Sequence, residues 1–146
     1  MSFVFEPIDA AWWWAQAATT WFLVGLIWVV QIVIYPQMAR MVSDGFPAWH
    51  RTYTQRIGWV VAPMMVLESA LASWWVFSSP DNGLAWVGAG LVMIVWASTF
   101  ALQIPLHRRL AEGWDEPTID RLVATNWVRT VAWSLRGMLF LDLIAT

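Results

Sequence analysis

Two ionisable residues stand inside long apolar stretches of the sequence, Glu68 in the second stretch and Arg136 in the last. At the rise of an α-helix, Glu68 lies about 16 Å beyond Ile57 and Arg136 about 13 Å beyond Trp127, both near the middle of a ~30 Å hydrocarbon core. An ionisable side chain at that depth is costly and needs a partner. We therefore predict that Glu68 and Arg136 meet, either as catalytic residues (an acid–base group and its charge anchor) or as a structural ion pair.

A second set of polar and aromatic residues lies nearer one end of the same stretches. Gln31 and Gln103 each stand on the last two turns of an apolar stretch, roughly 6–8 Å inside its end. If these side chains face the inside of the bundle, they predict an aromatic-walled pocket that binds a ligand. The alternative is hydrogen bonding between helices, which uses buried amides in the same way. The candidate ligand-binding residues are Gln31, Tyr35, Gln103, His107, Asn126, Arg129, Trp133 and His50.

Two histidines, His50 and His107, are the only ones in the chain, and cysteine is absent. No His-x-x-x-His or Glu-x-x-His spacing occurs, so we predict no metal site. Two axial imidazoles from His50 and His107 could hold a haem, which is a minor alternative. A zinc site made of both histidines and Glu68 has no better support. The cofactor, if any, is therefore left open.

The elements that must position these residues are predicted to be membrane-spanning helices. Of the 146 residues, 60% are hydrophobic and 14 are tryptophan, and nothing ionisable falls between Asp9 and Arg40 or between Asp81 and His107. Each gap exceeds the roughly 20 apolar residues that a spanning helix needs. We predict an all-α integral membrane four-helix bundle, a single domain over residues 1–146, with spans of about 11–36, 57–78, 84–106 and 126–144.

The distribution of arginine predicts the orientation of these spans. The basic residues are all arginines, and all but Arg136 gather in or beside the first and third connections, whereas the N-terminal tail and the turn at Pro80 carry none. By the positive-inside rule, both arginine-rich connections are cytoplasmic and both termini are non-cytoplasmic. This pattern, with a net charge of −2, gives no support to nucleic-acid binding.

Each cytoplasmic connection is predicted to contain a short amphipathic helix, one beginning at Pro47 and one after Pro117. Large apolar residues such as Phe46 and Leu122 would be left in water if these connections were solvated loops. We therefore expect both helices to lie in the plane of the lipid headgroups.

A weak internal repeat relates the two halves of the chain. Gln31 and Gln103 stand 72 residues apart, and Arg56 and Arg129 open the two return spans. Because each half starts and returns on the same side, the repeat would consist of two parallel helical hairpins. Matching topology alone also creates such spacing, so duplication and coincidence both stay open.

Five segments carry a resemblance to known proteins: Val30-Gln-Ile-Val-Ile-Tyr-Pro, Trp49-His-Arg-Thr-Tyr-Thr-Gln-Arg-Ile, Pro63-Met-Met-Val-Leu-Glu, Leu102-Gln-Ile-Pro-Leu-His-Arg-Arg-Leu and Thr125-Asn-Trp-Val-Arg-Thr-Val-Ala-Trp-Ser-Leu-Arg. Over most of the chain they resemble a family of small bacterial four-span integral membrane proteins. They are more distantly similar to small membrane proteins grouped with the anthrone oxygenases. The resemblance implies the four-span architecture and a place in the bacterial cytoplasmic membrane, and it carries no catalytic residues across.

Two classes of function follow from these features. The leading hypothesis is a protein whose cytoplasm-facing pocket binds a lipophilic molecule with a polar or anionic group, with or without transforming it. Glu68 would then be an acid or base, and Arg129 and Arg136 would be charge anchors. The alternative is a non-catalytic accessory subunit of a larger membrane complex, and a dimeric transporter is a third hypothesis. Expected partners are membrane lipids, a lipophilic small molecule, and a second copy or a larger complex.

Overall fold

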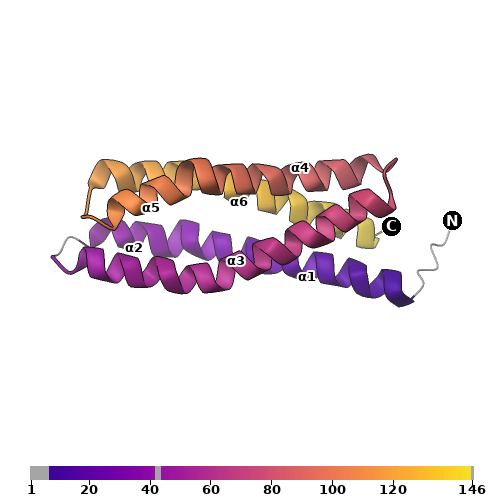
Figure 1. Ribbon diagram of the computed structural model, residues 1–146, viewed down its shortest axis with the longest axis horizontal. Helices are drawn as coiled ribbons and strands as arrows, with labels where there is room; N and C mark the ends of the chain where they lie inside the picture. Colours follow the sequence, from indigo (N-terminus) through magenta and orange to yellow (C-terminus); the bar gives the residue numbers. More distant parts are fainter. Residues whose placement is uncertain (1–6, 42–43, 146) are drawn as a thin grey trace.

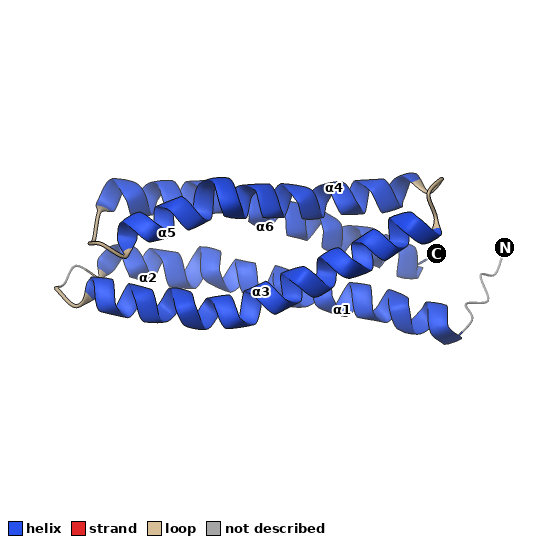
Figure 2. Cartoon of the chain, in the orientation of Figure 1, coloured by secondary structure: helices blue, strands red, loops and turns tan. Residues whose placement is uncertain are grey.

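The computed structural model describes residues 7–41 and 44–145, with side chains for 11–41 and 44–141. These residues form helices without any strand, arranged as four antiparallel rods (Figure 1 and Figure 2). The all-helical prediction is confirmed. In chain order the rods are α1 (Pro7–Val29), η1 (Val30–Ile34) and α2 (Tyr35–Arg40); α3 (Phe46–Ser78); α4 (Gly83–Ser98), η2 (Thr99–Gln103) and α5 (Ile104–Leu110); and α6 (Glu116–Ala145).

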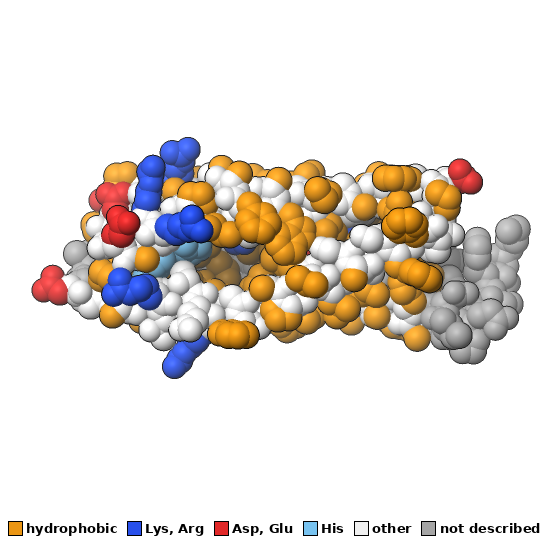
Figure 3. Space-filling view, in the orientation of Figure 1, with side chains coloured by type: hydrophobic (Ala, Val, Ile, Leu, Met, Phe, Trp, Pro, Cys, Tyr) orange, Lys and Arg blue, Asp and Glu red, His pale blue; other side chains and the backbone are white. Residues whose placement is uncertain are grey.

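Three of the rods are long and apolar enough to cross a membrane, namely Ala11–Arg40, Phe46–Ser78 and Gly83–Leu110. The fourth rod, α6, is of similar length but has arginines within its predicted span. Large apolar side chains lie on the outer surface, among them Trp59 and Phe77. Figure 3 shows hydrophobic side chains along the length of the visible face. An outer surface of this kind is typical of a helix bundle that contacts lipid rather than water.

The prediction of separate helices in the headgroup plane is wrong. The segment after Pro47 forms the first turns of α3, and the segment after Pro117 forms the first turns of α6. Phe46 and Leu122 are fully buried, because the apolar sides of these segments pack against the other rods. Each helix therefore continues straight past the predicted end of its span, and only short connections remain.

Two π-helical turns, η1 and η2, interrupt the first and third rods at matching places. Each turn ends two residues before a proline, Pro36 or Pro105. Proline lacks an N–H group and its ring clashes with the carbonyl four residues earlier, so a wider turn relieves the conflict. When η1 and η2 are matched in register, Gln103 corresponds to Ile34 rather than to Gln31. The two halves thus share a backbone feature, but not the glutamine correspondence that the sequence suggested.

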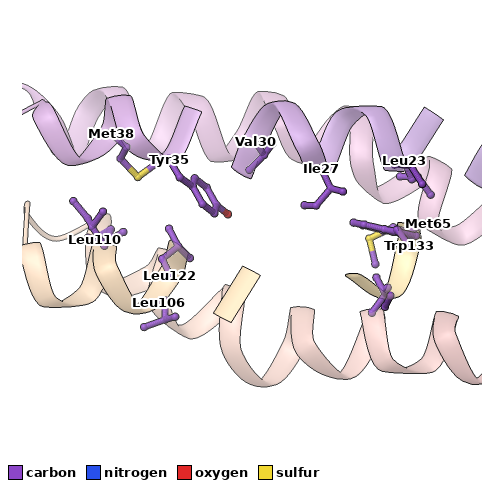
Figure 4. Close-up of a cluster of buried hydrophobic side chains, with 14 of the residues drawn as sticks. Leu23, Ile27, Val30, Tyr35, Met38, Met65, Leu106, Leu110, Leu122 and Trp133 are labelled. Carbon is purple, nitrogen blue, oxygen red and sulfur yellow. The ribbon is translucent and has the colours of Figure 1, made fainter. Parts of the chain in front are cut away.

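The rods pack as a ring in which α1 and α4 each contact both α3 and α6. The backbones of α3 and α5 approach each other closely at few places. Buried side chains from all four rods fill the centre, and a close-up shows Ile27, Val30 and Tyr35 pointing inward from the first rod (Figure 4). This arrangement brings the polar residues of α3 and α6 together across the middle of the bundle.

Candidate functional site

The central polar layer is an ion pair between diagonally opposite helices. Arg136 on α6 donates from Nε to Oε1 of Glu68 on α3 over 3.1 Å, and both side chains are almost completely buried. The predicted meeting of these residues is confirmed. It is the only ion pair within the part of the chain that the structure describes.

Further hydrogen bonds hold this pair in place. Glu68 accepts from Thr20 Oγ1 at 3.0 Å and from Trp133 Nε1 at 2.9 Å, and Arg136 Nη2 donates to Gln16 Oε1 at 2.6 Å. The carboxylate therefore has a donor on each oxygen and does not line the cavity described below. The sequence analysis missed Gln16 and Thr20, although their four-residue spacing inside an apolar stretch was a signal of one polar helix face.

A glycine on α4 allows the close approach of the guanidinium. A Cβ atom at Gly88 would lie 2.8 Å from Nη1 of Arg136 and 3.3 Å from the ring of Trp75. Because Nε and Nη2 of Arg136 are already bonded, the guanidinium has little freedom to move aside. All four rods thus contribute to a sealed layer, which we call the Glu68 layer.

Two helical turns away along α6, the bundle is hollow. A cavity of about 360 Å³ lies between the first half of α3 and the η2–α5 segment, with α1, η1, α2 and α6 completing its lining. The space-filling view shows a hollow there, with histidine surface at its edge (Figure 3). Its walls are mainly aliphatic, and Trp133 lines it while its indole N–H reaches Glu68. We call this region the Arg129 layer.

Arg129 is the buried cation of this cavity. Only 8% of its surface is exposed, and its Nε donates to Asn126 Oδ1 at 2.9 Å. Its Nη1 is 3.5 Å from Thr99 Oγ1. Among the described residues no carboxylate lies within ion-pair distance of this guanidinium. The cation therefore faces the cavity with neutral partners only.

The predicted pocket residues fall into two groups. Tyr35, Gln103, His107, Arg129 and Trp133 line the cavity, and the structure adds Tyr53 and Thr99, which the sequence analysis missed. Gln31, Asn126 and His50 do not line it.

The amides outside the cavity bond to each other instead. Asn126 donates to Gln31 Oε1 at 2.6 Å, and Gln31 donates to the carbonyl of Val123 at 3.2 Å. Interhelical hydrogen bonding, the alternative weighed above, therefore describes Gln31. Asn126 has a positioning role, because the same amide that holds Gln31 also orients Arg129.

The two histidines form a hydrogen-bonded pair. His50 Nε2 lies 3.0 Å from His107 Nδ1, and His107 Nε2 lies 3.3 Å from the hydroxyl of Tyr35. Two imidazoles at this separation leave no room for an iron atom and a porphyrin plane between them, so this pair does not fit as the two axial ligands of one haem. Glu68 belongs to the other layer, and the described residues contain no group of three His, Asp or Glu that could hold a metal ion. The zinc alternative is therefore not supported by the geometry.

Comparison with family models, curated proteins and solved structures gave no match to this chain. The resemblance to small bacterial four-span proteins stays a prediction. The chemistry of the site therefore has to be argued from its own residues. They offer a buried cation, a tyrosine hydroxyl, an amide and an imidazole around an otherwise aliphatic cavity. That combination suits an anionic group attached to a hydrocarbon chain.

Proposed function

We propose that the Arg129 layer binds a single-chain amphiphile with an anionic head, a carboxylate or a phosphate. The observation that carries this proposal is the buried guanidinium of Arg129, which faces an aliphatic cavity. No carboxylate of the described residues forms an ion pair with it. Burying an unpaired charge costs several kcal/mol. A bound anion would offset that cost, and no residue of the described chain does so in its place.

The polar atoms around Arg129 suit the oxygens of such a head. Tyr35 and Gln103 line the cavity and belong to different rods, and Tyr53 faces them from α3. Hydrogen bonds to a charged oxygen are stronger than those between neutral groups. An anion at Arg129 could therefore accept from a hydroxyl or an amide as well as from the guanidinium.

The size and place of the cavity define the rest of the ligand. About 360 Å³ is near the lower limit of roughly 300–1,000 Å³ for small-molecule pockets. This volume accommodates the head and the first part of a chain. Ile57, Val61 and Ile104 line the cavity on either side of the seam between α3 and α5. The remaining hydrocarbon would leave through this seam into the surrounding lipid.

This function requires a membrane, and we propose that all four rods span the bacterial cytoplasmic membrane with the arginine-rich end in the cytoplasm. Arginine side chains gather at the end of the bundle that carries the connections after α2 and α5 (Figure 3). The positive-inside rule places that end in the cytoplasm. The cavity lies on the same side of the Glu68 layer, so a ligand would enter from the cytoplasmic leaflet.

Binding can be tested with radiolabelled hexadecanoate and the purified protein in mild detergent. We expect hexadecanoate and hexadecyl phosphate to bind, and hexadecanol and hexadecyltrimethylammonium to bind far more weakly. Val61→Trp would fill the cavity and abolish binding, whereas Val66→Trp on the exposed side of the same helix would not. Equal binding of all four amphiphiles, or retention by the Val61 variant, would contradict the proposal and favour the accessory-subunit alternative.

The orientation has its own test, because the chain contains no cysteine. A cysteine at Asn82 should react with an impermeant thiol reagent only from the non-cytoplasmic side. One at Asp115 should react only from the cytoplasm. A cysteine at Ser2, which lies outside the described residues, should behave like the one at Asn82. Labelling of Asn82 from the cytoplasm would reverse the proposed topology.

A further inference from the structure

A chain of hydrogen bonds runs from a fully buried histidine to the cavity. His50 and His107 are joined at 3.0 Å, and His107 continues to Tyr35 at 3.3 Å. The hydroxyl of Tyr35 donates to Gln103 Oε1 at 3.4 Å, and Gln103 Nε2 donates to Thr125 Oγ1 at 3.0 Å. The residues come from α3, α5, α2, η2 and α6, so the chain crosses every rod of the bundle.

The donor and acceptor of each bond can be derived by starting from Thr125, at the opposite end of the chain from His50. Thr125 donates to the carbonyl of Arg121, so it accepts from Gln103. Since the amide oxygen of Gln103 has no proton, Tyr35 must be the donor to it. The Tyr35 oxygen is then free to accept from His107 Nε2.

The tautomers of both histidines follow. A neutral His107 with its proton on Nε2 has a bare Nδ1, which accepts from His50 Nε2. A neutral His50 with its proton on Nε2 likewise has a bare Nδ1. That atom is buried and has no hydrogen-bond partner. Every donor in the chain thus points the same way, and the chain begins at an unpaired proton acceptor.

None of the described groups around the histidines bonds to this acceptor. Phe46 stacks on the His50 ring at 5.5 Å, and Tyr53 lies beside both imidazoles. The neighbouring cations are Arg51, which is bonded to the carbonyl of Ala111, and Arg108 and Arg129 on the lining of the cavity. Among the described residues no carboxylate forms an ion pair or hydrogen bond with either histidine.

We propose that His50 and His107 form a proton relay that discharges a carboxylate bound at Arg129 and so releases it as a neutral acid. A proton from the arginine-rich end binds the buried Nδ1 of His50 when the side chains that cover this atom move aside. The Nε2 proton of His50 moves to Nδ1 of His107, and the Nε2 proton of His107 moves to the Tyr35 oxygen. The hydroxyl proton of Tyr35 moves to a carboxylate oxygen of the ligand, which takes the place of Gln103 Oε1 as its acceptor. One proton enters and one is delivered, and both imidazoles end neutral with their proton on Nδ1.

The consequence is a ligand that binds as an anion and leaves as an uncharged acid. Arg129 attracts the anion, and its attraction ends when the oxygen is protonated. This inference rests on the proposed function, because it needs a weak-acid ligand in the cavity. His50 and His107 would be relay residues, whereas the Tyr35 hydroxyl would be the group that touches the ligand.

The test is the dissociation rate of radiolabelled hexadecanoate from the intact protein as a function of pH. In the wild type we expect this rate to rise as the pH falls, by roughly tenfold per pH unit while the relay limits release. His50→Gln can donate to His107 but cannot carry a proton, so its rate should not change with pH. His107→Gln also interrupts the relay, and its position is only half-buried. It is the second variant to measure if the His50 variant does not fold.

The outcomes separate the relay from the binding site itself. Hexadecanesulfonate, which stays an anion, should dissociate at a rate independent of pH even from the wild type. A pH-independent rate for hexadecanoate in the wild type, or the same pH dependence in both histidine variants, would overturn the relay while leaving the binding site intact. Absence of hexadecanoate binding to the wild type would instead overturn the proposed function.

Discussion

Two arginines on the same face of α6, Arg129 and Arg136, have opposite surroundings. Arg136 meets a carboxylate, is fully buried and belongs to a layer in which all four rods pack closely. Arg129 has only neutral partners and borders a cavity. The comparison teaches that the type of residue and its depth do not decide its role. A buried charge that is compensated within the chain is costly to leave without its partner, whereas one left uncompensated beside a cavity is the kind that we propose to pair with a ligand.

Trp133 separates the two layers and contacts both. Its ring lines the cavity, with the Arg129 guanidinium 5.9 Å from the ring centre, and its N–H group donates to Glu68. The predictions below use substitutions that act on one layer and spare the other. They run from the largest to the smallest expected loss in the free energy of unfolding.

The largest loss of stability is expected from Glu68→Gln. This change removes the only carboxylate that pairs with Arg136 among the described residues and leaves its buried guanidinium unpaired, which costs about 3–5 kcal/mol. Combining it with Arg136→Leu should recover part of the loss, because no charge then remains in the layer. Reversible unfolding in mixed micelles measures the free energy of unfolding of the single and the double variants. A double variant as unstable as the sum of its single variants would show that the pair is not coupled.

A smaller loss is expected from Trp133→Phe. The ring still fills the border between the layers, but a hydrogen bond to a charged group is removed, which costs about 1.5–3 kcal/mol. The same unfolding assay measures this change. If the free energy of unfolding stays at the wild-type value, the indole N–H contributes nothing to the Glu68 layer.

The smallest loss is expected from Gly88→Ala, about 1 kcal/mol, because the added methyl group meets Nη1 of Arg136 and the Trp75 ring. Gly90→Ala on the same helix is the matched control. A Cβ there meets nothing within 4 Å, so it should be neutral or slightly stabilising. Equal effects of both changes would mean that the guanidinium moves aside freely.

The sequence predicted the Glu68 layer better than the Arg129 layer for a physical reason. Depth follows directly from the fixed rise of a helix, so the meeting of Glu68 and Arg136 could be derived from residue positions alone. The burial of Gln31 and Gln103 followed from the cost of an amide in hydrocarbon. Both are in fact buried.

The cavity could not be derived in the same way. Whether a buried amide bonds to a neighbour, as Gln31 does, or lines a cavity, as Gln103 does, depends on how each helix is rotated about its axis. The π-helical turns η1 and η2 alter that rotation just before Tyr35 and His107. A regular helical repeat does not anticipate them, although the prolines that follow were a signal. The opening at the seam also required the straight continuation of α3, where a separate surface helix had been predicted.

Arg129→Leu tests the central claim most directly, with free energy of unfolding and hexadecanoate binding measured on the same samples. Removing an unpaired buried charge should leave the protein at least as stable as the wild type, while binding is lost. Arg129→Lys keeps the charge and serves as the control, so it should retain at least part of the binding. A leucine variant that is destabilised as strongly as Glu68→Gln, or that binds hexadecanoate like the wild type, would contradict the distinction between the two layers.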